Sequence, residues 1–70
     1  MLEPNFTEPI IQFFAYSHLP ENLQLVSKPF GILAEQIINT ISRNPERTVA
    51  LRKLLESKDA AVRASLFKNE

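Results

Sequence analysis

The chain has 70 residues, 44% of them apolar, and is expected to form one small domain. At this size a single hydrophobic core gives only marginal stability, so a further source of stability is expected. The chain has no Cys and one His, which excludes a disulfide framework and in practice a metal site. The formal net charge is zero, so the chain lacks the positive excess typical of nucleic-acid-binding proteins. With disulfides and a metal site excluded, self-association is the remaining source of additional stability.

Charge is unevenly distributed along the chain. Residues 1–42 carry one base and four acids, and residues 43–70 carry seven bases and four acids, so the two parts are at about −3 and +3. Opposite parts could attract each other, and the basic part could face a phosphate, although a solvated helix surface is the simpler explanation. No apolar run reaches the roughly 20 residues of a membrane helix, and the N-terminus lacks the basic region of a signal peptide, so a cytoplasmic protein is expected.

The N-terminal part predicts one short helix. Residues 1–6 contain Pro4 and are expected to be loose. Thr7 can act as the N-cap of a helix over 8–15, because a proline is tolerated in the first turn. The apolar side chains expected to share one face and dock on the rest of the protein are those of Ile10, Phe13 and Phe14.

The segment 14–20, FAYSHLP, interrupts the helical pattern. Ser17, His18 and Pro20 favour a turn, and the residue before a proline is disfavoured in the helical region. We expect an ordered loop in which His18 makes a turn-stabilising hydrogen bond. The loop also combines an aromatic ring, a hydroxyl and an imidazole, which suits contact with a base or a phosphate.

A long helix is predicted over 21–42, with Pro29 near its middle. A proline inside a helix costs about 3 kcal/mol, so we expect a kink, or a restart with Ser27 as the cap. Ile32 and Ile38 widen the apolar face beyond what one partner helix needs. Residues with the three-and-four spacing of an amphipathic helix are Phe30, Leu33, Ile37 and Ile41.

A second long helix is predicted over 45–67. Asn44 suits the N-cap, Pro45 the first helical position, and Glu46 the first turn, where the helix dipole favours an acid. One stripe of this helix is mostly apolar. It consists of Leu51, Leu55, Lys58, Val62 and Ser65, flanked by Leu54 and Leu66.

Two cations, Arg47 and Lys58, project from within this apolar stripe, and their burial needs an explanation. Arg47 could pair with Glu46, with Glu35 or with acids of another protomer. Lys58 could extend toward Asp59 or Glu35 while its stem stays buried.

The turn over 42–44 is short enough to make the two long helices antiparallel. The predicted fold is therefore all-α, an antiparallel helical hairpin with a short N-terminal helix, assembled as a homo-oligomer. Ile32, Ile38 and Leu54 are expected to face other protomers, because two helices cannot enclose all of their apolar surface.

The residue inventory argues against catalysis. A nucleophile needs an adjacent base, a phosphate-binding loop needs several glycines, and the acids are scattered over helix surfaces, so no enzyme is expected. Two other classes stay open: an assembly module without ligand, and a helix-turn-helix DNA-binding protein. Against DNA binding, Glu46, Glu56 and Asp59 interrupt the basic helix.

The run PERTVALRKLLESKDAAVRA resembles the hallmark helix of the phage anti-CBASS and anti-Thoeris nucleotide sponges, and FAYSHLP is similar to that family's aromatic, Tyr, His and Pro segment. With Gln24 and the helix over 28–41, the resemblance covers roughly residues 13–67. It implies a phage-encoded homo-oligomer, typically a hexamer assembled from dimers, acting in the host bacterial cytoplasm. Such proteins bind cyclic dinucleotides, and in some cases cyclic trinucleotides or cyclic ADP-ribose isomers, without cleaving them and without a cofactor.

The resemblance also implies roles for residues. Tyr16 would stack on a base and Lys28 would be the cation on the ligand, in a pocket closed by a neighbouring protomer. Without the resemblance, Tyr16 is equally a rim aromatic and Lys28 a solvated side chain. Phe14, His18 and Pro20 would belong to the supporting loop. A second site near an oligomer axis would involve Arg47, Thr48 and Arg52.

Overall fold

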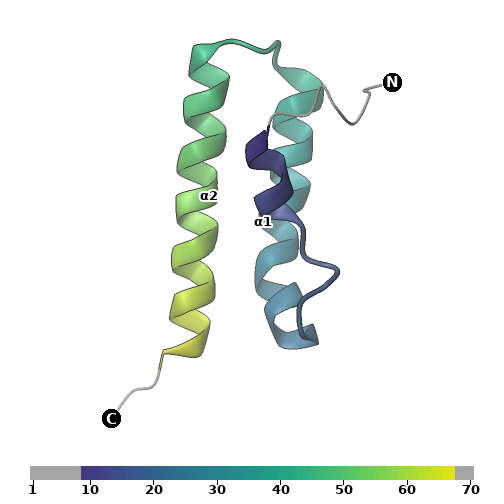
Figure 1. Ribbon diagram of the computed structural model, residues 1–70, viewed down its shortest axis with the longest axis vertical. Helices are drawn as coiled ribbons and strands as arrows, with labels where there is room; N and C mark the ends of the chain where they lie inside the picture. Colours follow the sequence, from purple (N-terminus) through teal and green to yellow (C-terminus); the bar gives the residue numbers. More distant parts are fainter. Residues whose placement is uncertain (1–8, 68–70) are drawn as a thin grey trace.

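The computed structural model describes residues 9–67, and all of the regular structure in this range is helical. A short 3₁₀ helix, η2 (Pro9–Phe14), precedes α1 (Glu21–Thr40) and α2 (Pro45–Leu66). The two α-helices lie antiparallel, and η2 packs against both (Figure 1). The predicted hairpin with a short N-terminal helix is therefore confirmed; the predicted loose segment 1–6 and the Thr7 cap lie outside the described residues.

The short helix has 3₁₀ geometry, with three residues per turn, and this changes the face that it buries. Phe14 is buried and Ile11, one 3₁₀ turn earlier, packs against the core. Phe13 is 56% exposed, so the prediction that it docks with Phe14 is wrong. The error follows from applying α-helical spacing to a segment of six residues.

Helix α1 continues through Pro29 without a restart. Ser27 is 1% exposed in the helix interior, so the prediction that it caps a second helix is wrong. Pro29 deprives the carbonyl group of Leu25, four residues earlier, of its helical donor. Leu25 is 74% exposed, so it lies on a solvent-facing side of α1, where a water molecule can replace the N–H donor that Pro29 lacks.

The start of α2 follows the sequence prediction. The Asn44 side chain accepts a hydrogen bond of 2.8 Å from the backbone N–H of Arg47, and Pro45 is the first helical residue. Both are standard helix-start features, so this boundary is fixed by local chemistry.

Arg47, the first of the two buried cations, links the ends of the two helices. Only 7% of the residue is exposed, and its Nη1 donates to the carbonyl oxygens of Ile41 at 2.7 Å and Ile38 at 3.3 Å. The last carbonyls of a helix lack intrahelical partners and carry the negative end of the dipole. Arg47 thus caps the C-terminal end of α1 by donating to backbone carbonyl oxygens. The sequence suggested instead that it pairs with a carboxylate.

Lys58, the second cation, keeps most of its side chain out of solvent. Its side chain is 13% exposed, and its Nζ lies 3.2 Å from the carboxylate of Asp59, whose side chain is 48% exposed. The prediction that Lys58 extends toward Asp59 is confirmed.

The core takes one buried apolar residue from each helix: Phe14 of η2, Ala34 of α1 and Leu51 of α2. Partly buried residues around it are Ile10, Ile11, Phe30, Ile37, Ile38, Leu54 and Leu55. Ile38 and Leu54 thus pack in part within the chain, and their contact with other protomers stays a prediction. Ile32 does stay 41% exposed.

Within residues 9–67, neither α-helix combines the length and the apolar character that a membrane span requires.

Candidate functional site

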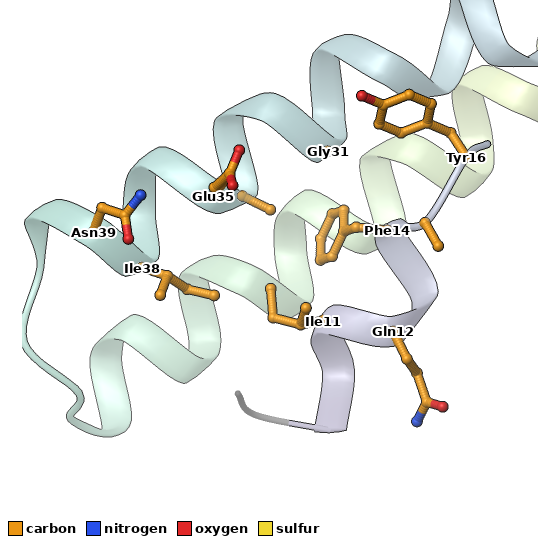
Figure 2. Close-up of a pocket in the computed structure, with 10 residues that line it drawn as sticks. Ile11, Gln12, Phe14, Tyr16, Gly31, Glu35, Ile38 and Asn39 are labelled. Carbon is orange, nitrogen blue, oxygen red and sulfur yellow. The ribbon is translucent and has the colours of Figure 1, made fainter. Parts of the chain in front are cut away.

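A pocket of about 620 Å³ opens where η2 and the segment after it cross α1 (Figure 2). Its volume lies in the range typical of small-molecule sites. Its apolar part comes from Ile11, Phe14, Ala15, Gly31, Ala34 and Ile38, and its polar groups come from Gln12, Tyr16, Glu35 and Asn39.

Tyr16 lies directly against α1 at Gly31. A Cβ atom added at Gly31 would be 3.1 Å from the carbonyl oxygen of Phe14 and 3.1 Å from Cδ2 and Cε2 of the Tyr16 ring. Such distances are shorter than ordinary van der Waals contact, so the missing side chain is what lets the chain cross the helix here. This packing explains the single glycine of the sequence.

Gly31→Leu is expected to displace Tyr16 from α1. Overpacking costs about 1–3 kcal/mol, which outweighs the roughly 1 kcal/mol of helix propensity gained on replacing Gly. The chain has one Tyr and no Trp, so its intrinsic fluorescence reports on Tyr16 alone. We expect a changed Tyr16 emission and a lower unfolding midpoint, whereas Ser57→Leu on the exposed surface of α2 should leave the emission unchanged. Native emission in Gly31→Leu would contradict this assignment.

The loop between Tyr16 and α1 is held by Gln24. Its Nε2 donates to the carbonyl oxygens of Leu19 at 2.7 Å and Ser17 at 3.2 Å, and the Leu19 N–H donates to the Tyr16 carbonyl at 3.0 Å. The sequence assigned this stabilising role to His18. That prediction is wrong, because His18 is exposed and no hydrogen bond of its side chain is found in the part of the chain that the structure describes.

The predicted loop residues have different surroundings. Phe14 is buried and Tyr16 half-buried, and both line the pocket. Pro20 is exposed at the N-cap position of α1, without a side-chain cap.

Lys28 is exposed and lies in a second, shallower hollow of about 420 Å³ on α1. Its neighbours there are Leu25, Pro29, Ile32, Leu33 and Gln36. The structure therefore does not bring Tyr16 and Lys28 into one pocket of a single chain.

The residues of the second predicted site are at the other end of α1 and on α2. Arg47 is buried in the hairpin, where its guanidinium bonds α1 carbonyls. The Thr48 hydroxyl donates to the Asn44 carbonyl at 3.3 Å, and Arg52 is exposed. Arg47 and Thr48 thus have structural contacts within the protomer.

Three polar pocket residues, Gln12, Glu35 and Asn39, were missed by the sequence analysis. The available signal was Gly31, because an isolated glycine inside a helix usually marks a close approach of other atoms. Along α1 the pocket residues follow in the order Gly31, Glu35 and Asn39, and Tyr16, from the segment before the helix, lies at the Gly31 end (Figure 2). Glu35 is the one charged residue among those that line the pocket, so a phosphate placed here needs a cation from elsewhere.

No group of His, Asp and Glu residues suited to a metal ion occurs in the range 9–67. Comparison with known protein families, with curated proteins and with solved structures finds no match for this chain.

Proposed function

We propose that this chain is a phage-encoded sponge that binds cyclic oligonucleotide immune messengers, cyclic dinucleotides first, and sequesters them without cleavage in the bacterial cytoplasm. The observation that carries the proposal is the Tyr16 ring at the rim of an apolar pocket of about 620 Å³. The resemblance of FAYSHLP and of the α2 sequence to such sponges supplies the class of ligand.

Tyr16 is suited to stacking on a base. Stacking on an aromatic ring contributes roughly 1–3 kcal/mol per base. The packing against Gly31 and the hydrogen bonds of Gln24 fix the segment that carries the ring before a ligand arrives. A preorganised ring binds more tightly, because less conformational entropy is lost on binding.

The polar groups of the pocket complement the edges of a base. Gln12 and Asn39 can donate and accept hydrogen bonds, and the Glu35 carboxylate accepts them from ring N–H or amino groups. The phosphates need the cation that the pocket lacks. In the proposed site Lys28 supplies it, in a pocket closed by a neighbouring protomer of the homo-oligomer.

A panel of cyclic dinucleotides, cyclic trinucleotides and cyclic ADP-ribose isomers tests the function. A ligand at 100 times its dissociation constant adds about 2.7 kcal/mol to the free energy of unfolding, which raises the unfolding midpoint measurably. We expect such a rise, with the ligand recovered intact. Absence of any rise at high ligand would overturn the proposal and favour the assembly module.

Tyr16→Ala is expected to weaken ligand binding by roughly 10- to 100-fold, as the loss of one stacked base implies. Tyr16→Phe keeps the ring and should keep most of the affinity. Phe13→Ala is the matched control, because Phe13 is an exposed aromatic residue that does not line the pocket. Isothermal titration calorimetry measures all three variants, and equal losses in Tyr16→Ala and Phe13→Ala would contradict the stacking role.

A further inference from the structure

Glu35 brings a negative charge to the lining of the Tyr16 pocket, and this sign is unexpected in a site for an anionic ligand. A phosphate is attracted by a cation and repelled by a carboxylate. Glu35 is exposed and takes part in no ion pair within the part of the chain that the structure describes. Its two oxygens are therefore available to a ligand, and a ligand group with several N–H donors would offset the repulsion.

Asn39 lies one helical turn beyond Glu35 on the same side of α1. Residues four apart on a helix are neighbours, with about 5–6 Å between their Cβ atoms. Both side chains line the pocket, and the Asn39 amide makes no hydrogen bond within the range 9–67. Figure 2 shows Glu35 and Asn39 in succession along the helix, with the Tyr16 ring at the Gly31 end. Together they offer two carboxylate acceptors and, beside them, an amide donor.

Guanine is the base whose Watson–Crick edge matches this set of groups. Its N1–H and its N2 amino group are adjacent donors, and O6 next to them is an acceptor. A carboxylate can accept from both donors at once, as it does from a guanidinium group. Adenine and cytosine each place a ring-nitrogen lone pair beside the amino group, so a carboxylate there meets one donor and one acceptor. Uracil has a single N–H between two carbonyl oxygens.

We propose that Glu35 selects guanine by accepting from N1–H and the N2 amino group of the base that stacks on Tyr16, while the Asn39 amide donates to O6. Glu35 lies four residues, about 6 Å of helix axis, beyond the Gly31 position against which Tyr16 packs. A base that covers the ring can reach that far. The inference rests on the proposed function for the stacked base and adds to it the identity of that base: cyclic dinucleotides that contain guanine bind better than those with adenine alone.

Isothermal titration calorimetry with cyclic di-GMP, cyclic di-AMP and cyclic di-IMP tests the selection. A bidentate contact discriminates against a wrong base by about 10- to 100-fold, so cyclic di-GMP should bind more tightly than cyclic di-AMP by that factor. Cyclic di-IMP keeps N1–H and O6 but lacks the N2 amino group, so its affinity should lie between the other two. Equal affinities for cyclic di-GMP and cyclic di-AMP would overturn the inference and leave the proposed function standing.

Glu35→Gln separates base recognition from the loss of a charge. The amide offers one acceptor and one donor in place of two acceptors, so it cannot bind both guanine donors. Loss of the negative charge by itself should strengthen all three anionic ligands equally and leave the ratio of their affinities unchanged. We expect the preference for cyclic di-GMP over cyclic di-AMP to fall about tenfold or more. A native ratio in Glu35→Gln would overturn the inference.

The matched control is Glu56→Gln, which makes the same substitution at an exposed acid on α2 that does not line the pocket. It should keep the native ratio of affinities. A fall in this ratio as large as that in Glu35→Gln would show that the preference does not arise at Glu35, and would overturn the inference.

GMP and AMP distinguish failure of the inference from failure of the proposed function. A mononucleotide presents the base without the cyclic framework, and saturation-transfer NMR detects its weak binding. Binding of GMP in preference to AMP, with no binding of any cyclic dinucleotide, would support guanine recognition and overturn the sponge. Absence of binding for every ligand of the set would overturn both.

Discussion

Leu51→Ala is expected to destabilise the protein by about 2–5 kcal/mol, a large effect for a single truncation. Leu51 is 0% exposed and packs with Phe14 and Ala34, so its removal leaves a cavity at the point where all three helices meet. The free energy of unfolding of a domain of this length is about 4–10 kcal/mol. The substitution should therefore remove a large share of the free energy of unfolding.

Urea unfolding followed by circular dichroism measures this effect. The protomer concentration must be equal for all variants, because association stabilises the folded state by mass action. Leu66→Ala is the matched control, since Leu66 is 56% exposed near the end of α2 and its truncation should cost less than about 0.5 kcal/mol. Similar midpoints for both variants would show that Leu51 is not the centre of the core.

Arg47→Met is expected to lower stability by about 2–3 kcal/mol. The substitution keeps an apolar stem but removes the hydrogen bonds from Nη1 to the carbonyl oxygens of Ile38 and Ile41. Hydrogen bonds to a charged group contribute about 1.5–3 kcal/mol, and the exposed end of α1 lets water recover part of that loss. For a domain of this size, such a loss lowers the unfolding midpoint by about 10 °C or more.

The control for Arg47→Met is Arg52→Met, which makes the same substitution at an exposed position on α2. It should change stability by no more than about 0.5 kcal/mol. Native stability in Arg47→Met would show that the carbonyl contacts contribute little. A loss of ligand-induced stabilisation in a folded Arg47→Met variant would instead support the ligand role that the resemblance implies.

The candidate site could be predicted only in part. Tyr16 was singled out through the loop composition and the resemblance, and the structure does give it a pocket. Glu35 and Asn39 gave no signal, because one polar residue per turn on a helix is indistinguishable from ordinary surface. Tyr16 and Lys28 lie in separate hollows, and residue spacing could not predict this. Their relative position depends on where the loop that carries Tyr16 crosses α1.

The sequence by itself determined the features that arise within a few residues. The order Asn44, Pro45, Glu46 starts α2 through a cap, a fixed φ and a favourable charge, all local effects. The short turn after α1 dictates the antiparallel hairpin for the same reason.

Tertiary structure decided the features that depend on contacts between distant segments. Pro29 stays inside one continuous helix, because packing of α1 along α2 outweighs the loss of one hydrogen bond. Arg47 is buried because the hairpin brings it to the carbonyls at the end of α1. Gly31 is needed because the loop crosses the helix there. Each of these depends on which groups meet in space, and periodicity along the chain does not encode that.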